Sequence, residues 1–160
     1  MRVTFADFGS DIASSRLRAK IPQQELAKLG IKKGHDVLIY GKHWIPDAAL
    51  ENFKRLIYDV VDDHFAHDGL GDYYRRHIAM ADAVTCNSEY MKTLIKDETG
   101  RDAIVVMEPY ESDEQEPDIG PFLYWYGHKS NLMDLERIAP ALAHPLMILT
   151  NKEGYPEWTQ

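Results

Sequence analysis

The sequence predicts an α/β protein with a doubly wound, mostly parallel, Rossmann-like sheet that carries helices on both faces. Short apolar segments rich in Val, Ile and Leu alternate with longer segments whose apolar residues recur at helical spacing. The connections between them are short and contain Gly, Pro, Asn and Ser. This alternation is typical of parallel strands joined by helical crossovers.

Composition restricts the function classes. The 160 residues suit one domain, or one domain with a fragment of another, and a net charge of −8 argues against a partner such as nucleic acid. Cys86 is the single cysteine, so neither an intramolecular disulfide nor a Cys-rich metal site is expected. Residues 1–7 do not resemble a signal peptide, and no apolar run approaches the roughly 20 residues of a transmembrane helix. We therefore expect a cytoplasmic protein with no transmembrane segment.

The first part of the chain is expected to form five strands, over residues 2–7, 36–40, 55–61, 83–86 and 103–107. The first connecting helix has Ser14 or Ser15 as its cap and Gly30 as its stop, with Pro22 either kinking it or beginning a second helix. Its expected apolar face consists of Leu17, Ile21, Leu26 and Leu29.

The later helices of this part are expected over residues 46–54, 71–81 and 88–98. In the second of these, Tyr73, His77, Ile78 and Met80 are predicted to face the sheet. His77 is expected to be a packed or half-exposed helical residue and not a ligand. Asn87 or Ser88 should cap the third helix, and Gly100 should end it. Cys86 is expected to be a buried strand residue.

An acidic segment with few apolar residues, 111–120, reads as a linker. After it a strand over 122–126, a helix over 132–143 and a strand over 145–150 restart the pattern. The prediction is one Rossmann-like domain over 1–118 and a partial βαβ unit over 119–160.

Polar residues follow several of the predicted strands, where an open α/β sheet binds its ligands. Asp62, Asp63 and His64 follow the third strand and are candidates for acid–base chemistry, although they could equally cap the next helix. Asn87, Ser88 and Glu89 follow the fourth. The loop at Gly9 and Ser10, with Arg16 and Arg18 after it, could hold an anion at a helix N-terminus, but a purely structural role is favoured for it alone.

Five segments in this order resemble glycosyltransferases of the two-Rossmann-domain (GT-B) class, of the glycosyltransferase group 1 type. They are SSRLRA at 14–19, YDVVDDHF at 58–65, ADAVTCNSEYM at 81–91, MEPYE at 107–111 and WYGHKSNL at 125–132. The resemblance covers nearly the whole chain.

This resemblance implies transfer of a sugar from a nucleotide-sugar donor to an acceptor hydroxyl, such as that of a glycan, with no obligatory metal or other cofactor. It makes 1–118 the acceptor-type domain, with Asp62, Asp63 and His64 on the acceptor side and Asn87, Ser88 and Glu89 beside them. Gly9, Ser10 and Arg16 would lie near the diphosphate. Gly127, His128 and Asn131 would begin the phosphate loop of the donor-type domain.

The sequence departs from the family pattern in two places. A strand usual in such first domains is missing between Gly30 and Asp36, and the chain ends about 40 residues into the second domain. We therefore expect an incomplete enzyme that can self-associate through an apolar surface. Two alternatives stay open: a non-catalytic Rossmann-like binding or interaction module, and a different enzyme that holds a divalent metal with Asp59, Asp62, Asp63 and His64.

Overall fold

The computed structural model describes residues 1–7, 15–41, 45–108, 120–127 and 132–149. The chain divides into two compact units, Met1–Ser112 and Asp113–Gln160. The predicted boundary after residue 118 and this division both fall in segment 109–119, which lies outside the described residues. The predicted linker over 111–120 lies almost wholly in the same segment. Each unit is described by itself.

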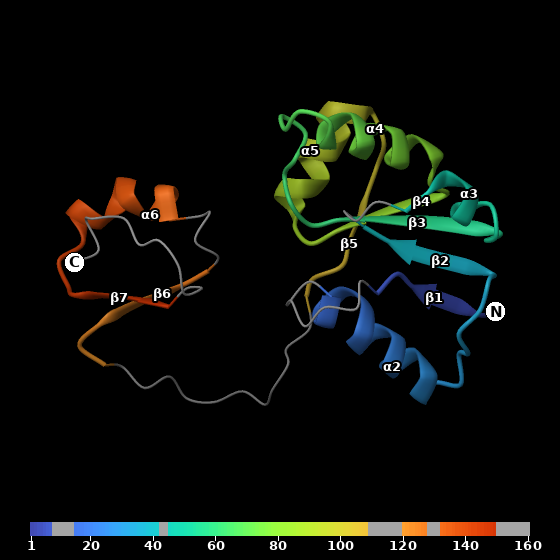
Figure 1. Cartoon of the computed structure of the whole chain (residues 1–160), viewed down its shortest axis with the longest axis horizontal. Helices are drawn as coiled ribbons and strands as arrows, with labels where there is room; N and C mark the ends of the chain where they lie inside the picture. Colours follow the sequence, from blue (N-terminus) through green and yellow to red (C-terminus); the bar gives the residue numbers. More distant parts are fainter. Residues whose placement is uncertain (8–14, 42–44, 109–119, 128–131, 150–160) are drawn as a thin grey trace. The chain divides into compact units, whose positions relative to one another are not determined.

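Unit 1 contains a five-stranded sheet in which every strand is parallel to its neighbours (Figure 1). The order is consecutive: β1 (Val3–Phe5), β2 (Val37–Tyr40), β3 (Arg55–Val60), β4 (Ala83–Cys86) and β5 (Ile104–Val105). The predicted α/β class and parallel sheet are confirmed. Both edge strands are shorter than predicted, and Ile104 in β5 is 62% exposed, because an edge strand has a partner on one side only.

One face of the sheet forms the main hydrophobic core. Side chains alternate along a strand, so Leu38 and Tyr40 of β2, Tyr58 and Val60 of β3, and Val84 of β4 share this face and are all buried. Three helices supply the residues packed against it: α3 (Asp47–Leu50), α4 (Leu70–Met80) and α5 (Glu89–Thr99). Cys86 belongs to the same core, as predicted.

Helix α4 is anchored by aromatic residues. Tyr73, Tyr74, His77 and Ile78 are buried, which confirms the predicted packing of His77. Met80, predicted to face the sheet, is 43% exposed. The chain leaves the helix at the next residue, Ala81, so the side chain of Met80 lies beyond the part that contacts the strands.

Helices α3 and α5 differ in how well the sequence predicts them. Helix α5 has the predicted cap and stop, since Ser88 accepts from the Met91 N–H at 3.2 Å and Gly100 has φ +72°. Helix α3 is shorter than the predicted 46–54, and Pro46 precedes it as its N-cap. The backbone N–H of Lys54 donates to the carbonyl of His35 (3.2 Å), which draws the chain out of the helix toward β3.

The opposite face of the sheet is covered by a π-helical turn, η1 (Arg16–Lys20), that runs directly into α2 (Ile21–Lys28). Pro22 explains the π-turn, because it has no N–H to donate to the carbonyl of residue 18 and its ring would clash there. The prediction that Pro22 begins a second helix is confirmed, and Gly30, at φ +78°, lies just past the helix end as predicted.

Two expectations for this segment are wrong. Ser15 has helical dihedrals and makes no capping bond; its hydroxyl donates to Asp7 Oδ1 at 2.6 Å instead. Leu29 does not join an apolar face, since it is 76% exposed in the turn after α2. The alternative cap, Ser14, lies outside the described residues.

Unit 2 contains one parallel βαβ arrangement. Strand β6 (Leu123–Tyr126) pairs with β7 (Leu146–Leu149), and α6 (Leu132–Ile138) with the 3-10 turn η3 (Ala139–Ala141) connects them. Leu132 and Leu135 of α6 are buried. The helix is shorter than the predicted 132–143, because Pro140 begins the change to a 3-10 turn.

Within the ranges given above, no helix combines the length and the apolar composition that crossing a bilayer requires.

Candidate functional site

The carboxyl ends of β1 to β5 meet at one edge of the sheet, because all five strands are parallel. Among described residues, Asp7, Gly41, Asp62 and Asn87 follow β1, β2, β3 and β4 in turn. This edge is therefore where the sequence-predicted polar residues of unit 1 can be compared with the structure.

The three predicted catalytic residues occur together after β3, but in different settings. His64 Nε2 lies 3.9 Å from Asp62 Oδ2, and both side chains are partly exposed, at 31% and 42%. Asp63 Oδ1 accepts from the N–H of Phe65 at 3.2 Å and so stabilises the loop. The His64 ring packs edge-on against Tyr74 at a centroid distance of 5.7 Å. Asp62 and His64 form an accessible acid–imidazole pair, whereas Asp63 contributes to loop structure.

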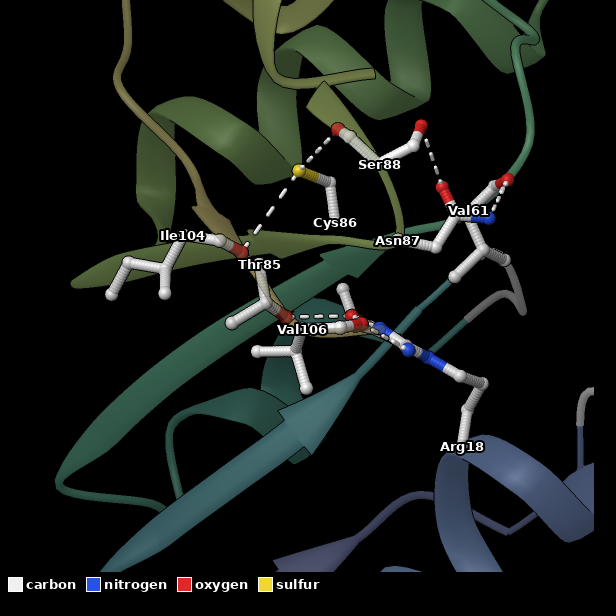
Figure 2. A network of polar contacts seen from close by, with 9 residues as sticks. Arg18, Val61, Thr85, Cys86, Asn87, Ser88, Ile104 and Val106 are labelled. Atoms are coloured by element: carbon white, nitrogen blue, oxygen red, sulfur yellow. Dashed lines mark hydrogen bonds and ion pairs between the residues drawn. The ribbon is translucent and has the colours of Figure 1, made fainter. Parts of the chain in front are cut away.

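Of the residues predicted after β4, Asn87 contacts the backbone at the end of β3. Its Nδ2 donates to the carbonyl of Val61 at 3.1 Å, so it holds the end of β4 against the end of β3 (Figure 2). The Ser88 hydroxyl caps α5. Glu89 lies in the first turn of α5, where it pairs with Lys92 at 3.4 Å and is largely exposed. Ser88 and Glu89 thus have helix-stabilising roles at the start of α5.

A buried ion pair lies on the other face of the sheet from the core. Asp59 points there because its strand neighbours Tyr58 and Val60 fill the core face. Arg18 Nε donates to Asp59 Oδ2 at 2.8 Å and Arg18 Nη2 donates to Oδ1. The Thr85 hydroxyl donates to the same Oδ1 at 2.6 Å.

The remaining guanidinium nitrogen, Arg18 Nη1, donates to the carbonyl of Val106 at 2.7 Å (Figure 2). One side chain from η1 therefore contacts β3 and the segment after β5. Burial acts to lower the pKa of Arg18, but the hydrogen bond and charge of Asp59 outweigh it and leave this pKa raised. Arg18 is therefore held in its charged form.

This ion pair corrects one of the alternatives raised by the sequence. Asp59 does not join Asp62, Asp63 and His64 in a metal-binding set, since its carboxylate is occupied by Arg18 and Thr85. Over the described ranges, no three His, Cys, Asp or Glu side chains gather in a way that could hold a metal ion. The strand alternation could have placed Asp59 correctly, but nothing in the sequence identified Arg18 as its partner.

A cavity of about 190 Å³ adjoins the ion pair on this face. Its walls come from the sheet, from η1 and the start of α2, and from the segment after β5. The apolar lining residues are Phe5, Leu17, Pro22, Ile39, Ile57, Val106 and Met107, and the polar ones are Arg18, Asp59 and Thr85. The polar groups already satisfy one another, so the cavity presents a mainly apolar surface.

The connections that follow β1 and β2 lie on opposite faces of the sheet. The connection after β1 crosses the cavity face through η1 and α2, whereas the next three cross the core face through α3, α4 and α5. In open α/β sheets ligands bind where neighbouring strands send their connections to opposite faces. Gly41 lies there, and a Cβ at this position would come 2.8 Å from the carbonyl oxygen of Asp59.

The remaining predicted site residues are Gly9, Ser10, Arg16, Gly127, His128 and Asn131. Gly9, Ser10, His128 and Asn131 lie outside the described residues. Gly127 follows β6 in unit 2, where its N–H donates to the carbonyl of Leu149 at 3.1 Å. Arg16 lies in η1, two residues before Arg18, and is partly buried.

Comparisons of this chain with protein-family models, with curated proteins and with solved structures found no match.

Proposed function

We propose that this protein is glycosyltransferase-like and that unit 1 binds the hydroxyl acceptor of a sugar transfer. The observation that carries the proposal is the Asp62–His64 pair at the carboxyl end of β3, with 3.9 Å between Oδ2 and Nε2. Asn87 supports it by holding the neighbouring strand end against Val61. This arrangement fits the acceptor role that the sequence resemblance gives to these residues.

In the proposed reaction, neutral His64 accepts the proton of the acceptor hydroxyl, and Asp62 stabilises the imidazolium that forms. The hydroxyl oxygen forms a bond to the anomeric carbon of the donor sugar. The bond from that carbon to the phosphate oxygen breaks, and the nucleoside diphosphate leaves with the electron pair. The partly exposed imidazole of His64 would orient the acceptor for this step.

The donor is proposed to be a nucleotide sugar bound without an obligatory metal. The loop after β1, with Gly9 and Ser10, would contact the diphosphate, and Arg16 in η1 would add a cation. Gly127, His128 and Asn131 of unit 2 would contribute from the donor side. The opposite faces taken by the connections after β1 and β2 support this placement, because open α/β sheets bind ligands where neighbouring strands connect to opposite faces.

The test is calorimetric titration of the full chain with UDP-, GDP- and ADP-sugars, each with and without Mg²⁺, followed by a search for transfer products. We expect one nucleotide class to bind without Mg²⁺. His64→Gln and Asp62→Asn should abolish any transfer, while Asp97→Asn, a change of an exposed carboxylate on α5, should not. Absence of binding by all three classes would overturn the proposal.

The second candidate function is a non-catalytic binding or interaction module with a Rossmann-like fold. It is favoured by the roles of Asp63 and Ser88, whose side chains stabilise a loop and a helix. Under this proposal a ligand binds but no nucleotide sugar is turned over. His64→Gln then changes neither the ligand binding nor the absence of turnover. The titration above, combined with the product search, separates the two candidates.

A further inference from the structure

Helix α2 and the turn η1 before it cover the sheet with little buried apolar surface. None of the eight residues of α2, all of which are described, is buried, and Ala19 is the buried residue of η1. By contrast, α4 buries five residues and α5 buries Met91 and Ile95. Apolar burial is the main source of helix docking, so η1 and α2 gain much less of it than the helices on the core face.

Polar contacts hold this segment in place. Arg18 reaches across the cavity face to Asp59 and to the carbonyl of Val106, and the Gln23 side chain accepts from the N–H of Phe5 at 3.2 Å. Leu17, Arg18 and Pro22 form the helical wall of the 190 Å³ cavity. The cavity means that part of the space beneath the helix holds no packed side chains.

Pro22 fixes the direction of Arg18. The π-turn that Pro22 imposes ends at Lys20, and Ile21 N–H donates to the carbonyl of Arg16. This turn places the Arg18 side chain toward Asp59, where its side chain is 11% exposed. At the other end of the segment, Gly30 has φ +78°, a conformation that glycine adopts without strain, and no atom lies within 4 Å of where a Cβ would be, so the chain can turn there with little steric resistance.

We propose that η1 and α2 form a flap that opens separately from the rest of unit 1, with Arg18 as its latch. Segments with little buried apolar surface open at a lower free energy than the global unfolding of the domain. Opening the flap removes one wall of the apolar cavity and exposes Asp59. Arg18 acts as a positioning residue in this device and need not contact a ligand.

Native-state hydrogen exchange of the full chain tests the proposal. We expect the amides of residues 23–28 to exchange through an opening with a weaker urea dependence than the amides of α4 and α5. Arg18→Gln should increase exchange in α2 by roughly tenfold or more, because it removes charged hydrogen bonds to a buried carboxylate. Exchange in α4 should change far less, since its packing does not involve Arg18.

Two further variants separate a local effect on α2 from a general loss of stability. Arg18→Gln combined with Asp59→Asn removes both charges and avoids an unpaired buried carboxylate, so it should fold and still loosen α2. Arg55→Gln breaks the exposed pair with Asp82 on the same sheet and serves as the matched control, with no effect on α2. The proposal is overturned if wild-type α2 exchanges only with global unfolding, or if the Arg18 variants accelerate all helices equally.

Discussion

The buried side chain of His77 makes the stability of this fold depend on pH. It is 0% exposed, stacked on Tyr73 at 3.9 Å between ring centroids, and its Nδ1 lies 3.1 Å from the Tyr40 hydroxyl. Burial lowers its pKa below the ordinary value of 6.5, and the charge of Arg76 acts in the same direction, while Asp47 opposes both. The folded protein therefore keeps this imidazole neutral.

The sign of the pH effect follows from that shift. Below about pH 6.5 the unfolded chain binds a proton at His77 that the folded protein does not, so the free energy of unfolding should fall as the pH drops from 7.5 to 5.5. Urea unfolding at several pH values measures this dependence. His77→Gln should be less stable at pH 7.5 and should lose part of the slope, whereas His144→Gln, an exposed change, should keep it. Equal slopes in wild type and His77→Gln would contradict the prediction.

Two tyrosines in the same core have hydroxyl groups that lack the kind of hydrogen-bond partner that His77 has. Among the described residues, the hydroxyls of Tyr58 and Tyr74 have no hydrogen-bond partner, although both side chains are almost fully buried. Burial raises the pKa of each, and the neighbouring tyrosines and carboxylates add to the shift. An unpaired buried hydroxyl costs about 1–3 kcal/mol, so this core favours ring packing over polar satisfaction.

At the scale of elements, α5 is the helix whose ends are best specified. Ser88 is its N-cap, Gly100 follows its last turn in the left-handed conformation, and Met91 and Ile95 bury its inner face. Helix α2 has a comparable stop at Gly30 but no buried residue. Local capping signals therefore predict where a helix ends, and the apolar residues it buries decide how firmly it docks.

Substitutions of Ser88, the N-cap of α5, test whether this residue stabilises the helix or belongs to a ligand-binding site. Ser88→Ala should lower the free energy of unfolding by about 1 kcal/mol, because the N–H of Met91 loses its acceptor. Ser88→Asp should retain most of the stability, since Asp also caps helices. Urea unfolding measures both. Full stability of Ser88→Ala would show that the hydroxyl is not needed as a cap and would favour a binding role.

At the scale of the whole molecule, the described part of unit 2 has apolar side chains exposed on one face of its sheet. Tyr124 and Tyr126 of β6 are paired in register with Met147 and Leu149 of β7, and the exposed fractions of these four side chains range from 40% to 83%. Parallel sheets are normally covered on both faces. An apolar surface of this kind is consistent with the expected self-association.

Self-association through this face can be measured by sedimentation equilibrium. We expect the wild-type chain to show a mass that rises with concentration, and the double variant Tyr126→Ser and Leu149→Lys to remain monomeric. Glu136→Lys, on exposed helix α6, changes charge without touching the face and should behave as wild type. A wild-type mass that is independent of concentration would exclude the homo-oligomer.

The strand order of unit 1 and the faces taken by its connections are defined only by the whole sheet. The strands follow one another without a reversal, yet the first connection covers the face opposite to the next three. The first connection therefore has the opposite hand from the others, although crossovers between parallel strands are right-handed in about 98% of cases. Residues 29–36 contain no strand, and β1 is an edge strand of the sheet.

Sequence patterns alone predict the α/β alternation, the positions of the central strands, the ends of α5 and the burial of Cys86. These features follow from alternation, helical spacing and local capping, which act over a few residues. The exposed Leu29, the short α3 and the structural use of Ser15, Asp63 and Ser88 could not be predicted in the same way, because each depends on a competing contact.

Tertiary structure alone decided the partner of Asp59. Its strand position turns the carboxylate away from the core face, and a π-turn 41 residues earlier in the sequence brings Arg18 to it. Whether a carboxylate near a strand end acts on a ligand or neutralises a buried cation depends on which charge the fold places beside it. That choice is made by packing between distant segments, which local sequence patterns do not record.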